Sequence, residues 1–180
     1  MHYMRCSPRS KRAMPPEDAA PEDITGQQIV TGEQAHFRAL ESLYRTAPIN
    51  RLFPSTLTIV APGFARIRFE VDERVHHAAG AAHGTSYFKM LDDAAFYAAN
   101  SLVSDTFLLT TAFNLLFTRP IKAGPIVAEG HWISGKRRVY VADARLIDGD
   151  GEECARGTGT FMRSRIPLAS LPGYAEAMRK

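Results

Sequence analysis

The stretch His83–Val103, HGTSYFKMLDDAAFYAANSLV, decides the fold of this 180-residue chain. It predicts one long helix, because about five turns follow Gly84 without another Gly or Pro. At roughly 100° per residue, one arc of this helix carries Phe88 and most of the apolar side chains: Leu91, Ala95, Phe96, Ala99 and Leu102. A second arc carries the polar side chains: Lys89, Asp93, Tyr97 and Asn100. Because Met90 and Ala98 lie outside both arcs, we expect the helix to be buried over most of its circumference.

Asp92 is the unusual residue of this helix. It falls about 40° from Phe88, inside the apolar arc, whereas Asp93 falls among the polar residues. A carboxylate in apolar surroundings costs several kcal/mol unless it has a partner, or else its pKa rises. Such groups cluster at functional sites. Helix geometry alone leaves two interpretations open: a functional carboxylate, or one that caps a neighbouring loop or pairs with an arginine.

The composition, 45% hydrophobic and 23% charged, is typical of a globular protein. A net charge of +3 and a pI near 9.0 suit an anionic ligand and do not require nucleic acid. The two cysteines, Cys6 and Cys154, fall in an expected tail and an expected strand, which argues against a disulfide framework. No apolar run approaches the roughly 18 residues of a membrane span, and no signal-peptide core is present. We therefore expect a cytoplasmic protein that binds neither nucleic acid nor a membrane.

Three segments are expected along the chain. Residues 1–32 carry prolines and mixed charges with little periodicity, which predicts a flexible leader. Its first 14 residues lack acids and faintly resemble a transit peptide, although a tail or an over-extended start fits better. Residues 33–164 form the folded domain. Residues 165–180 form a tail, or one short helix over Leu168–Met178.

The order of elements in the domain predicts an α+β fold. A helix over Glu33–Thr46 comes first. Alternation predicts two strands before the long helix, Thr56–Val60 and Ala65–Val71. Four more strand-like runs follow the helix: Leu108–Thr118, Ile126–Ser134, Arg138–Ile147 and Glu152–Met162. Turn signals such as Asp148–Gly151 separate them. Strands on both sides of one helix predict an antiparallel sheet wrapped around it.

Residues 33–164, and His77–Asp92 in particular, resemble the hotdog-fold thioesterases, specifically the PaaI-like group. In that family an Asn or Gln precedes the run G-x-x-H-G-G, and a catalytic Asp or Glu follows the His by nine residues. Gly80, His83 and Gly84 match the run, and Asp92 stands nine residues after His83. Thr85 replaces the second Gly, and His77 occupies the Asn/Gln position, six before His83.

The resemblance implies hydrolysis of an acyl-CoA thioester. A thiolate leaves readily, so one carboxylate and one oxyanion site suffice. Asp92 would attack the carbonyl carbon or act as general base on a water molecule. The Gly84 N–H, at the positive end of the helix, would bind the oxyanion with help from Thr85. His77 and His83 would support the site.

The spacing of Gly84 and Asp92 predicts a dimer. They are eight residues apart, about 12 Å along a helix at about 1.5 Å per residue. Both groups must lie within roughly 3 Å of the reacting carbonyl, which one straight helix cannot achieve. Two chains related by a two-fold axis can, with Gly84 of one chain meeting Asp92 of the other. We therefore expect a homodimer, which is also the family's assembly, and a homotetramer built from two dimers is common there.

Substrate contacts are expected on both parts of an acyl-CoA. The phosphates of CoA would meet one of two basic clusters, each of which could equally be a solvated turn: Lys136, Arg137 and Arg138, or Arg119 and Lys122. The acyl pocket would be lined by Phe88, Phe96 and Tyr97, although packing is the simpler role for Tyr97. No cofactor is expected beyond the CoA that the substrate carries.

Other chemistries fit less well. The histidines His76, His77 and His83 lack the spacing of a zinc site, and no G-x-S-x-G elbow surrounds Ser86 or Ser101. A hotdog dehydratase or hydratase would carry a Pro-rich loop before the helix. A non-catalytic module that binds acyl-CoA or lipid stays open, because His77 departs from the family pattern.

Overall fold

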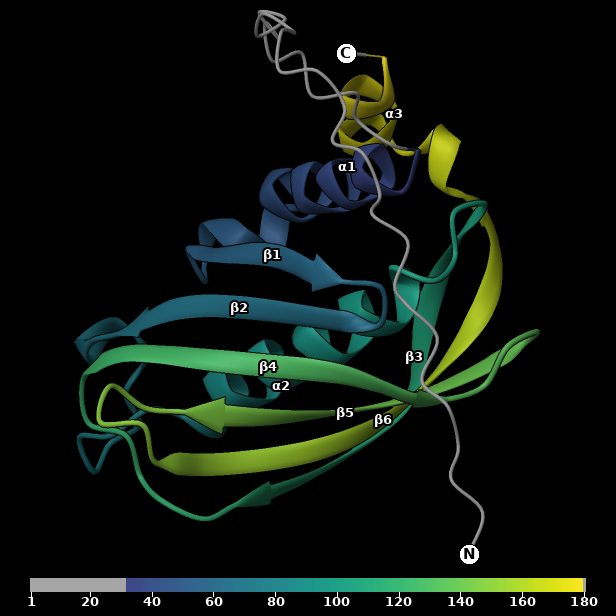
Figure 1. Cartoon of the computed structure of the whole chain (residues 1–180). Helices are drawn as coiled ribbons and strands as arrows, with labels where there is room; N and C mark the ends of the chain where they lie inside the picture. The colour runs from purple at the N-terminus through teal and green to yellow at the C-terminus, as the bar shows by residue number, and fades with distance from the viewer. Residues whose placement is uncertain (1–31, 180) are drawn as a thin grey trace, which may run out of the picture.

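Six antiparallel strands form one sheet that wraps around the helix α2 (Gly84–Asn100), as Figure 1 shows. The computed structural model describes residues 32–179, so nearly all of the predicted leader lies outside it. The spatial order is β1-β2-β4-β5-β6-β3. The strands are β1 (Ser55–Ala61), β2 (Phe64–Val71), β3 (Thr106–Phe117), β4 (Gly124–Ser134), β5 (Val139–Ile147) and β6 (Glu153–Pro167). The predicted α+β architecture is confirmed, and each predicted strand is found within five residues of its expected ends.

Two further helices cover one end of the sheet. Helix α1 (Gly32–Thr46) packs against β1 and against α3 (Pro172–Met178), and both lie above the sheet in Figure 1. The buried His36 links the helices: its Nε2 donates to the Asn100 carbonyl at 3.2 Å, and its Nδ1 accepts from the Tyr174 hydroxyl at 2.7 Å. Burial lowers the pKa of His36, which keeps the ring neutral in this role.

Helix α2 is buried on almost every side, as its sequence predicts. The two predicted arcs do not match the burial of their residues. Tyr97 and Asn100 on the polar arc are only 6% and 0% exposed, whereas Phe88 on the apolar arc is 43% exposed. The helix also approaches β4 closely. A Cβ on Gly130 would lie 2.1 Å from the Ala94 carbonyl oxygen, so only glycine fits there. This contact fixes the depth of α2 in the sheet.

The two edges of the sheet differ. Helix α1 packs against the edge strand β1, whereas β3 is a long edge strand of 12 residues with an apolar sequence. Three of its large apolar side chains are strongly exposed: Leu109 (46%), Leu116 (60%) and Phe117 (57%). Such an edge offers unpaired N–H and C=O groups to another strand. No helix within residues 32–179 is long and apolar enough to cross a membrane.

Candidate active site

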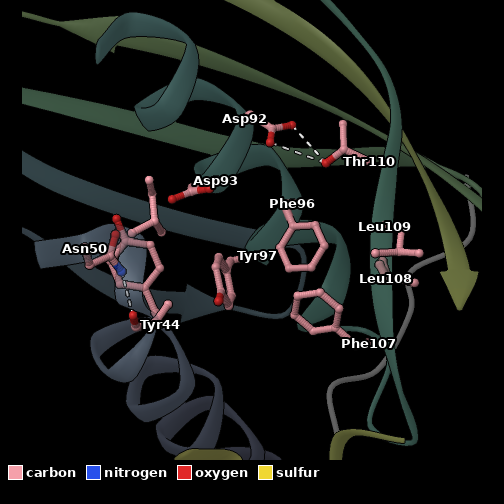
Figure 2. A pocket seen from close by; sticks show the side chains of 12 residues that line it. Tyr44, Asn50, Asp92, Asp93, Phe96, Tyr97, Phe107, Leu108, Leu109 and Thr110 are labelled. Carbon is pink, nitrogen blue, oxygen red and sulfur yellow. Dashed lines mark hydrogen bonds between the residues drawn. The ribbon is translucent and has the colours of Figure 1, made fainter. Parts of the chain in front are cut away.

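Asp92 lies half-buried on α2, facing the edge strand β3 (Figure 2). The Thr110 hydroxyl donates to its carboxylate, 3.1 Å from Oδ1 and 3.4 Å from Oδ2. Burial raises the pKa of Asp92 to about 6; the Thr110 hydrogen bond opposes that rise, and the Asp93 charge adds to it. Within residues 32–179 no ion pair involves Asp92. Within residues 32–179 the carboxylate therefore has a hydroxyl donor and no arginine partner, and its pKa lies above the usual range of an aspartate.

A cavity of about 260 Å³ opens beside Asp92 and is called the Asp92 cavity here. Its lining combines the two acids of α2 with aromatic rings and Thr110: Asp93, Tyr44, Phe96, Tyr97, Phe107 and Thr110. The rings of Phe96 and Phe107 are 4.9 Å apart, and those of Phe96 and Tyr97 are 5.0 Å apart. The cavity thus has one acidic end and an aromatic wall, visible in Figure 2. Two predicted pocket residues, Phe96 and Tyr97, are placed in it.

Asp93 differs from Asp92 because it has a cation as partner. Lys89, whose side chain is 10% exposed, donates to the Asp93 carboxylate one helical turn away. The same ammonium group donates to Asn50 Oδ1 at 2.8 Å and to the Tyr44 hydroxyl at 3.3 Å. Burial raises the pKa of Asp93, and the Lys89 charge opposes that rise. Of the two neighbouring acids, Asp93 is therefore paired with a cation, whereas Asp92 forms no ion pair with any of residues 32–179.

At its other end, α2 begins at Gly84, with His83 as the N-cap. His83 Nδ1 accepts a hydrogen bond from the Thr85 N–H at 3.1 Å, and a second, short one joins it to the Thr85 hydroxyl. Within residues 32–179 the Gly84 N–H has no hydrogen-bond partner. Of the two amides predicted to bind an oxyanion, the Thr85 amide is thus engaged by His83, and the Gly84 amide is free.

Gly84 lines a second cavity, of about 430 Å³, which we call the Gly84 cavity. His77 and Arg119 also line it. Nδ1 of the exposed His77 ring accepts a hydrogen bond from the Ala79 N–H at 3.0 Å, within the loop before α2. Arg119 forms an exposed ion pair with Glu152 at 3.1 Å. The structure therefore brings Gly84, His77 and Arg119 together around one cavity.

The remaining predicted contacts lie elsewhere in the chain. Phe88 is outside the Asp92 cavity and packs edge-on against Phe113 of β3, with ring centres 5.6 Å apart. The exposed basic cluster lies in the turn between β4 and β5: Lys136, Arg137 and Arg138. Strand β2 pairs with β4, and Val71, the last residue of β2 before the loop that leads to α2, pairs with Gly124 at the start of β4. Phe64, at the other end of β2, pairs with His131, close to the turn that carries the basic cluster. The basic cluster is therefore at the opposite end of the sheet from Gly84 of the same chain.

The two cavities share no lining residue. Gly84 and Asp92 lie eight residues apart on one continuous helix, about 12 Å at about 1.5 Å per residue. One chain by itself therefore does not place a carboxylate and a helix-terminal amide around one carbonyl group. Among residues 32–179 no group of three or more His, Cys, Asp or Glu side chains is positioned to hold a metal ion.

Thr110 and the network around Lys89 were not predicted from the sequence. Thr110 stands in a run whose sequence predicts only a strand, and its contact with Asp92 spans 18 residues. Asn50 lies in a short 3-10 turn, Pro48–Arg51, between the predicted helix Glu33–Thr46 and the first predicted strand. The spacing of Lys89 and Asp93 did carry a signal, since an acid and a base four residues apart on a helix commonly pair.

Comparison with known proteins gives consistent relatives. The sequence model of the thioesterase superfamily matches residues 79–155. A proposed esterase from Saccharolobus solfataricus is 31% identical over 100 residues, which is 56% of this chain and 67% of the relative. One from Sulfurisphaera tokodaii is 29% identical over 100 residues, 55% of this chain and 74% of the relative.

Solved structures share the fold. The Escherichia coli PaaI protein of the phenylacetic acid degradation operon superposes with a TM-score of 0.69 at 19% identity, covering 75% of this chain and 97% of that one. The Haemophilus influenzae thioesterase HI1161 gives a TM-score of 0.63 at 16% identity, over 72% and 89% of the two chains. These similarities confirm the predicted hotdog architecture.

Proposed function

This chain belongs to the thioesterase superfamily, and from that premise we propose that it hydrolyses acyl-CoA thioesters to the free acid and CoA. The observation that carries the proposal is the half-buried Asp92 carboxylate, which has a pKa of about 6, no ion-pair partner within residues 32–179, and a cavity beside it. A carboxylate of this kind is mostly ionised at neutral pH, yet it is basic enough to accept a proton.

Asp92 acts as the general base in this proposal. It takes a proton from a water molecule while that water attacks the thioester carbonyl, and the CoA thiolate then leaves. The Thr110 hydrogen bond holds the carboxylate toward the cavity. A pKa raised toward the working pH favours this role over direct attack, because proton transfer is most efficient when the pKa of the base is near the pH. Hydrolysis in H₂¹⁸O under single-turnover conditions separates general-base catalysis from a nucleophilic route in which water opens the anhydride at the Asp92 carbonyl. With a general base the label enters the product acid, whereas in that nucleophilic route the acid is unlabelled and the label enters Asp92.

The oxyanion that forms is bound by the free Gly84 N–H of a second copy of the chain. The first amides of a helix carry partial positive charge, and Gly84 has no Cβ to keep a ligand oxygen away. The edge strand β3 supports the pairing of two chains, since its outer edge has unpaired backbone groups. It also carries three exposed apolar side chains: Leu109, Leu116 and Phe117. We therefore propose an obligate homodimer with two sites at its interface.

Mixing two inactive variants tests this arrangement. Asp92→Asn removes the base. Gly84→Pro removes the N–H at the first helical position, where proline is well tolerated, and the extended His83 (φ −66°, ψ 144°) suits a residue before proline. After joint refolding, mixed dimers have one site with both native residues, so we expect about a quarter of the wild-type activity to return.

The control is Gly84→Ala, which keeps the N–H. Its Cβ would lie 3.1 Å from the end of the exposed Phe117 ring, which can move aside. This variant should retain most activity, whereas Gly84→Pro should lose about 10²–10³ in kcat. Absence of complementation in mixtures that have demonstrably exchanged chains would contradict a site shared between two chains.

A second candidate is a module that binds acyl-CoA without hydrolysing it. The observation that favours it is His77, which occupies the Asn/Gln position and already accepts a backbone hydrogen bond. The two functions differ in one measurement, thiol release from a panel of acyl-CoAs with CoA binding followed in parallel. If the native chain binds acyl-CoA and releases no thiol, the result would support the binding module and contradict a catalytic role for Asp92.

A further inference from the structure

A third cavity, of about 510 Å³, lies under helix α3 and is called the α3 cavity here. Its walls come from the end of α1, the start of α3 and the end of β6, through Leu43, Leu171 and Ile166 among others. One charged side chain, that of Glu176, lies in its lining, and Glu176 is exposed. An apolar cavity of this size suits a hydrocarbon chain.

This cavity adjoins the Asp92 cavity. Ala47, Tyr97 and Phe107 line both of them, so these three residues form the boundary between the two spaces. Tyr97 follows Asp92 by five residues on α2, and Phe107 precedes Thr110 by three residues on β3. These shared residues therefore place the α3 cavity next to the Asp92 cavity, on the side of the C-terminal end of α2.

We propose that the acyl chain of the substrate passes this boundary and ends in the α3 cavity, so that the protein prefers long, unbranched, apolar acyl groups. The inference rests on the proposed function and adds its substrate class. The Asp92 cavity alone, at about 260 Å³, is smaller than the roughly 300–1,000 Å³ of ordinary ligand sites, and the two cavities together fall within that range.

Of the polar side chains that line the α3 cavity, the Thr46 hydroxyl already donates to carbonyls of α1, and Glu176 is exposed. A free polar ligand would therefore find few partners, whereas an acyl chain that begins beside Asp92 would continue into the adjoining apolar space. Ala47, which follows α1, contributes only a methyl group to the boundary. Its backbone is extended (φ −63°, ψ 129°) before Pro48, a conformation that larger residues also adopt.

Two substitutions should shorten the accepted chain to different lengths. Ala47→Leu adds volume at the boundary between the two cavities. Ile166→Trp fills part of the α3 cavity from a position whose side chain is 40% exposed. Ala169→Leu is the matched control, because Ala169 is exposed on the adjoining 3-10 turn and does not line the cavity. The measurement is kcat/KM for straight-chain acyl-CoAs from butanoyl to hexadecanoyl.

In the native protein each methylene buried in the α3 cavity should raise kcat/KM by up to about fourfold. Ala47→Leu should lower the ratio of decanoyl to butanoyl kcat/KM by roughly tenfold or more, and Ile166→Trp should act only on longer chains. Ala169→Leu should leave the whole profile unchanged. An identical length profile in all four proteins would overturn the inference while leaving thioester hydrolysis intact.

A structure of the Asp92→Asn variant with decanoyl-CoA gives a readout that does not depend on turnover. The chain is expected between Tyr97 and Phe107 with its end beside Leu171. A chain that lies along the outer face of β3, or in the Gly84 cavity, overturns the inference. Failure of the proposed function would look different, since the native protein would then release no thiol from an acyl-CoA of any length.

Discussion

The Thr110 hydroxyl on the edge strand β3 ties the Asp92 carboxylate of the central helix to the sheet, at 3.1 Å. The hydrogen bond stabilises the ionised carboxylate and so opposes the effect of burial on its pKa. The edge strand thereby acts on the base directly, and the contact can be removed without touching either acid.

Thr110→Val should move the acidic limb of the pH–rate profile to higher pH. Without the hydroxyl, the charged form of Asp92 loses its donor, and the pKa of the carboxyl rises further. The measurement is kcat/KM as a function of pH, and Thr110→Ser, which keeps a hydroxyl, should restore the native profile. Superimposable profiles for the Val and native proteins would remove Thr110 from the control of Asp92.

Asp93→Asn should move the same limb in the opposite direction. The Asp93 charge raises the pKa of Asp92, and its removal leaves Lys89, whose charge lowers that pKa. The expected result is an inflection below the native value of about 6. Lys89→Met, which removes the cation and keeps Asp93, should shift it upward. Equal shifts of the same sign in both variants would contradict this account.

Asp92→Asn should stabilise the folded protein at alkaline pH and leave its stability nearly unchanged at pH 4. The folded carboxyl has a pKa of about 6, above the value of about 3.9 in an unfolded chain, so the native state loses stability as the pH rises through this window. At pH 8 the gain in the free energy of unfolding should be about 1–3 kcal/mol, measured by denaturant titration. The exposed Asp150→Asn serves as the control and should show no such pH dependence.

The double substitution Leu116→Lys with Phe117→Lys should weaken the proposed dimer by roughly tenfold to 100-fold and lower activity in step. Adjacent strand residues point to opposite faces, so the pair places a charge on both faces of the edge. Sedimentation velocity over a range of concentrations measures the association. Val60→Lys, at a 44%-exposed position on the other edge strand, is the control. A double variant that stays dimeric and active would place the interface elsewhere.

Gly130→Ala should destabilise the fold by about 2–4 kcal/mol, because its Cβ would meet the Ala94 carbonyl oxygen at 2.1 Å and neither backbone can yield cheaply. Gly149→Ala is the matched control, since the nearest atom to its Cβ is a Pro125 side-chain carbon at 3.4 Å. The measurement is the denaturant midpoint of each variant. Similar midpoints would show that α2 can move away from β4.

The order and limits of the elements were predictable because strands and helices leave periodic patterns. The runs that became β1 and β2 alternate, and those that became β3 to β6 are strand-like runs separated by turn signals. The predicted helix Glu33–Thr46 differs from α1 by one residue at its start. The burial of α2 was less predictable. A wheel of one helix identifies polar and apolar arcs, yet Tyr97 and Asn100 are buried because neighbouring elements surround them, and Phe88 is exposed because the sheet ends beside it.

The candidate site likewise contains residues that the sequence identifies and residues that only the fold identifies. Asp92 stood out because a carboxylate falls in the apolar arc of the helix, and Gly84 stood out because it matches the motif of the thioesterases. Thr110 and Asn50 obey every local rule, and their contacts depend on residues distant in the sequence, so only the fold brings them to the site. Lys136, Arg137 and Arg138 show the reverse case. Their charges predicted a phosphate contact, but the register of the sheet places them at the opposite end of the sheet from Gly84 of the same chain.

The separation of the Asp92 cavity from the Gly84 cavity has a consequence for regulation by abundance. On the proposed mechanism a solitary chain is inert, so turnover at low expression would rise with the square of the amount of protein made. A cell that produced only traces would keep its thioester pool untouched. Modest further synthesis would then start consumption abruptly, with no effector needed.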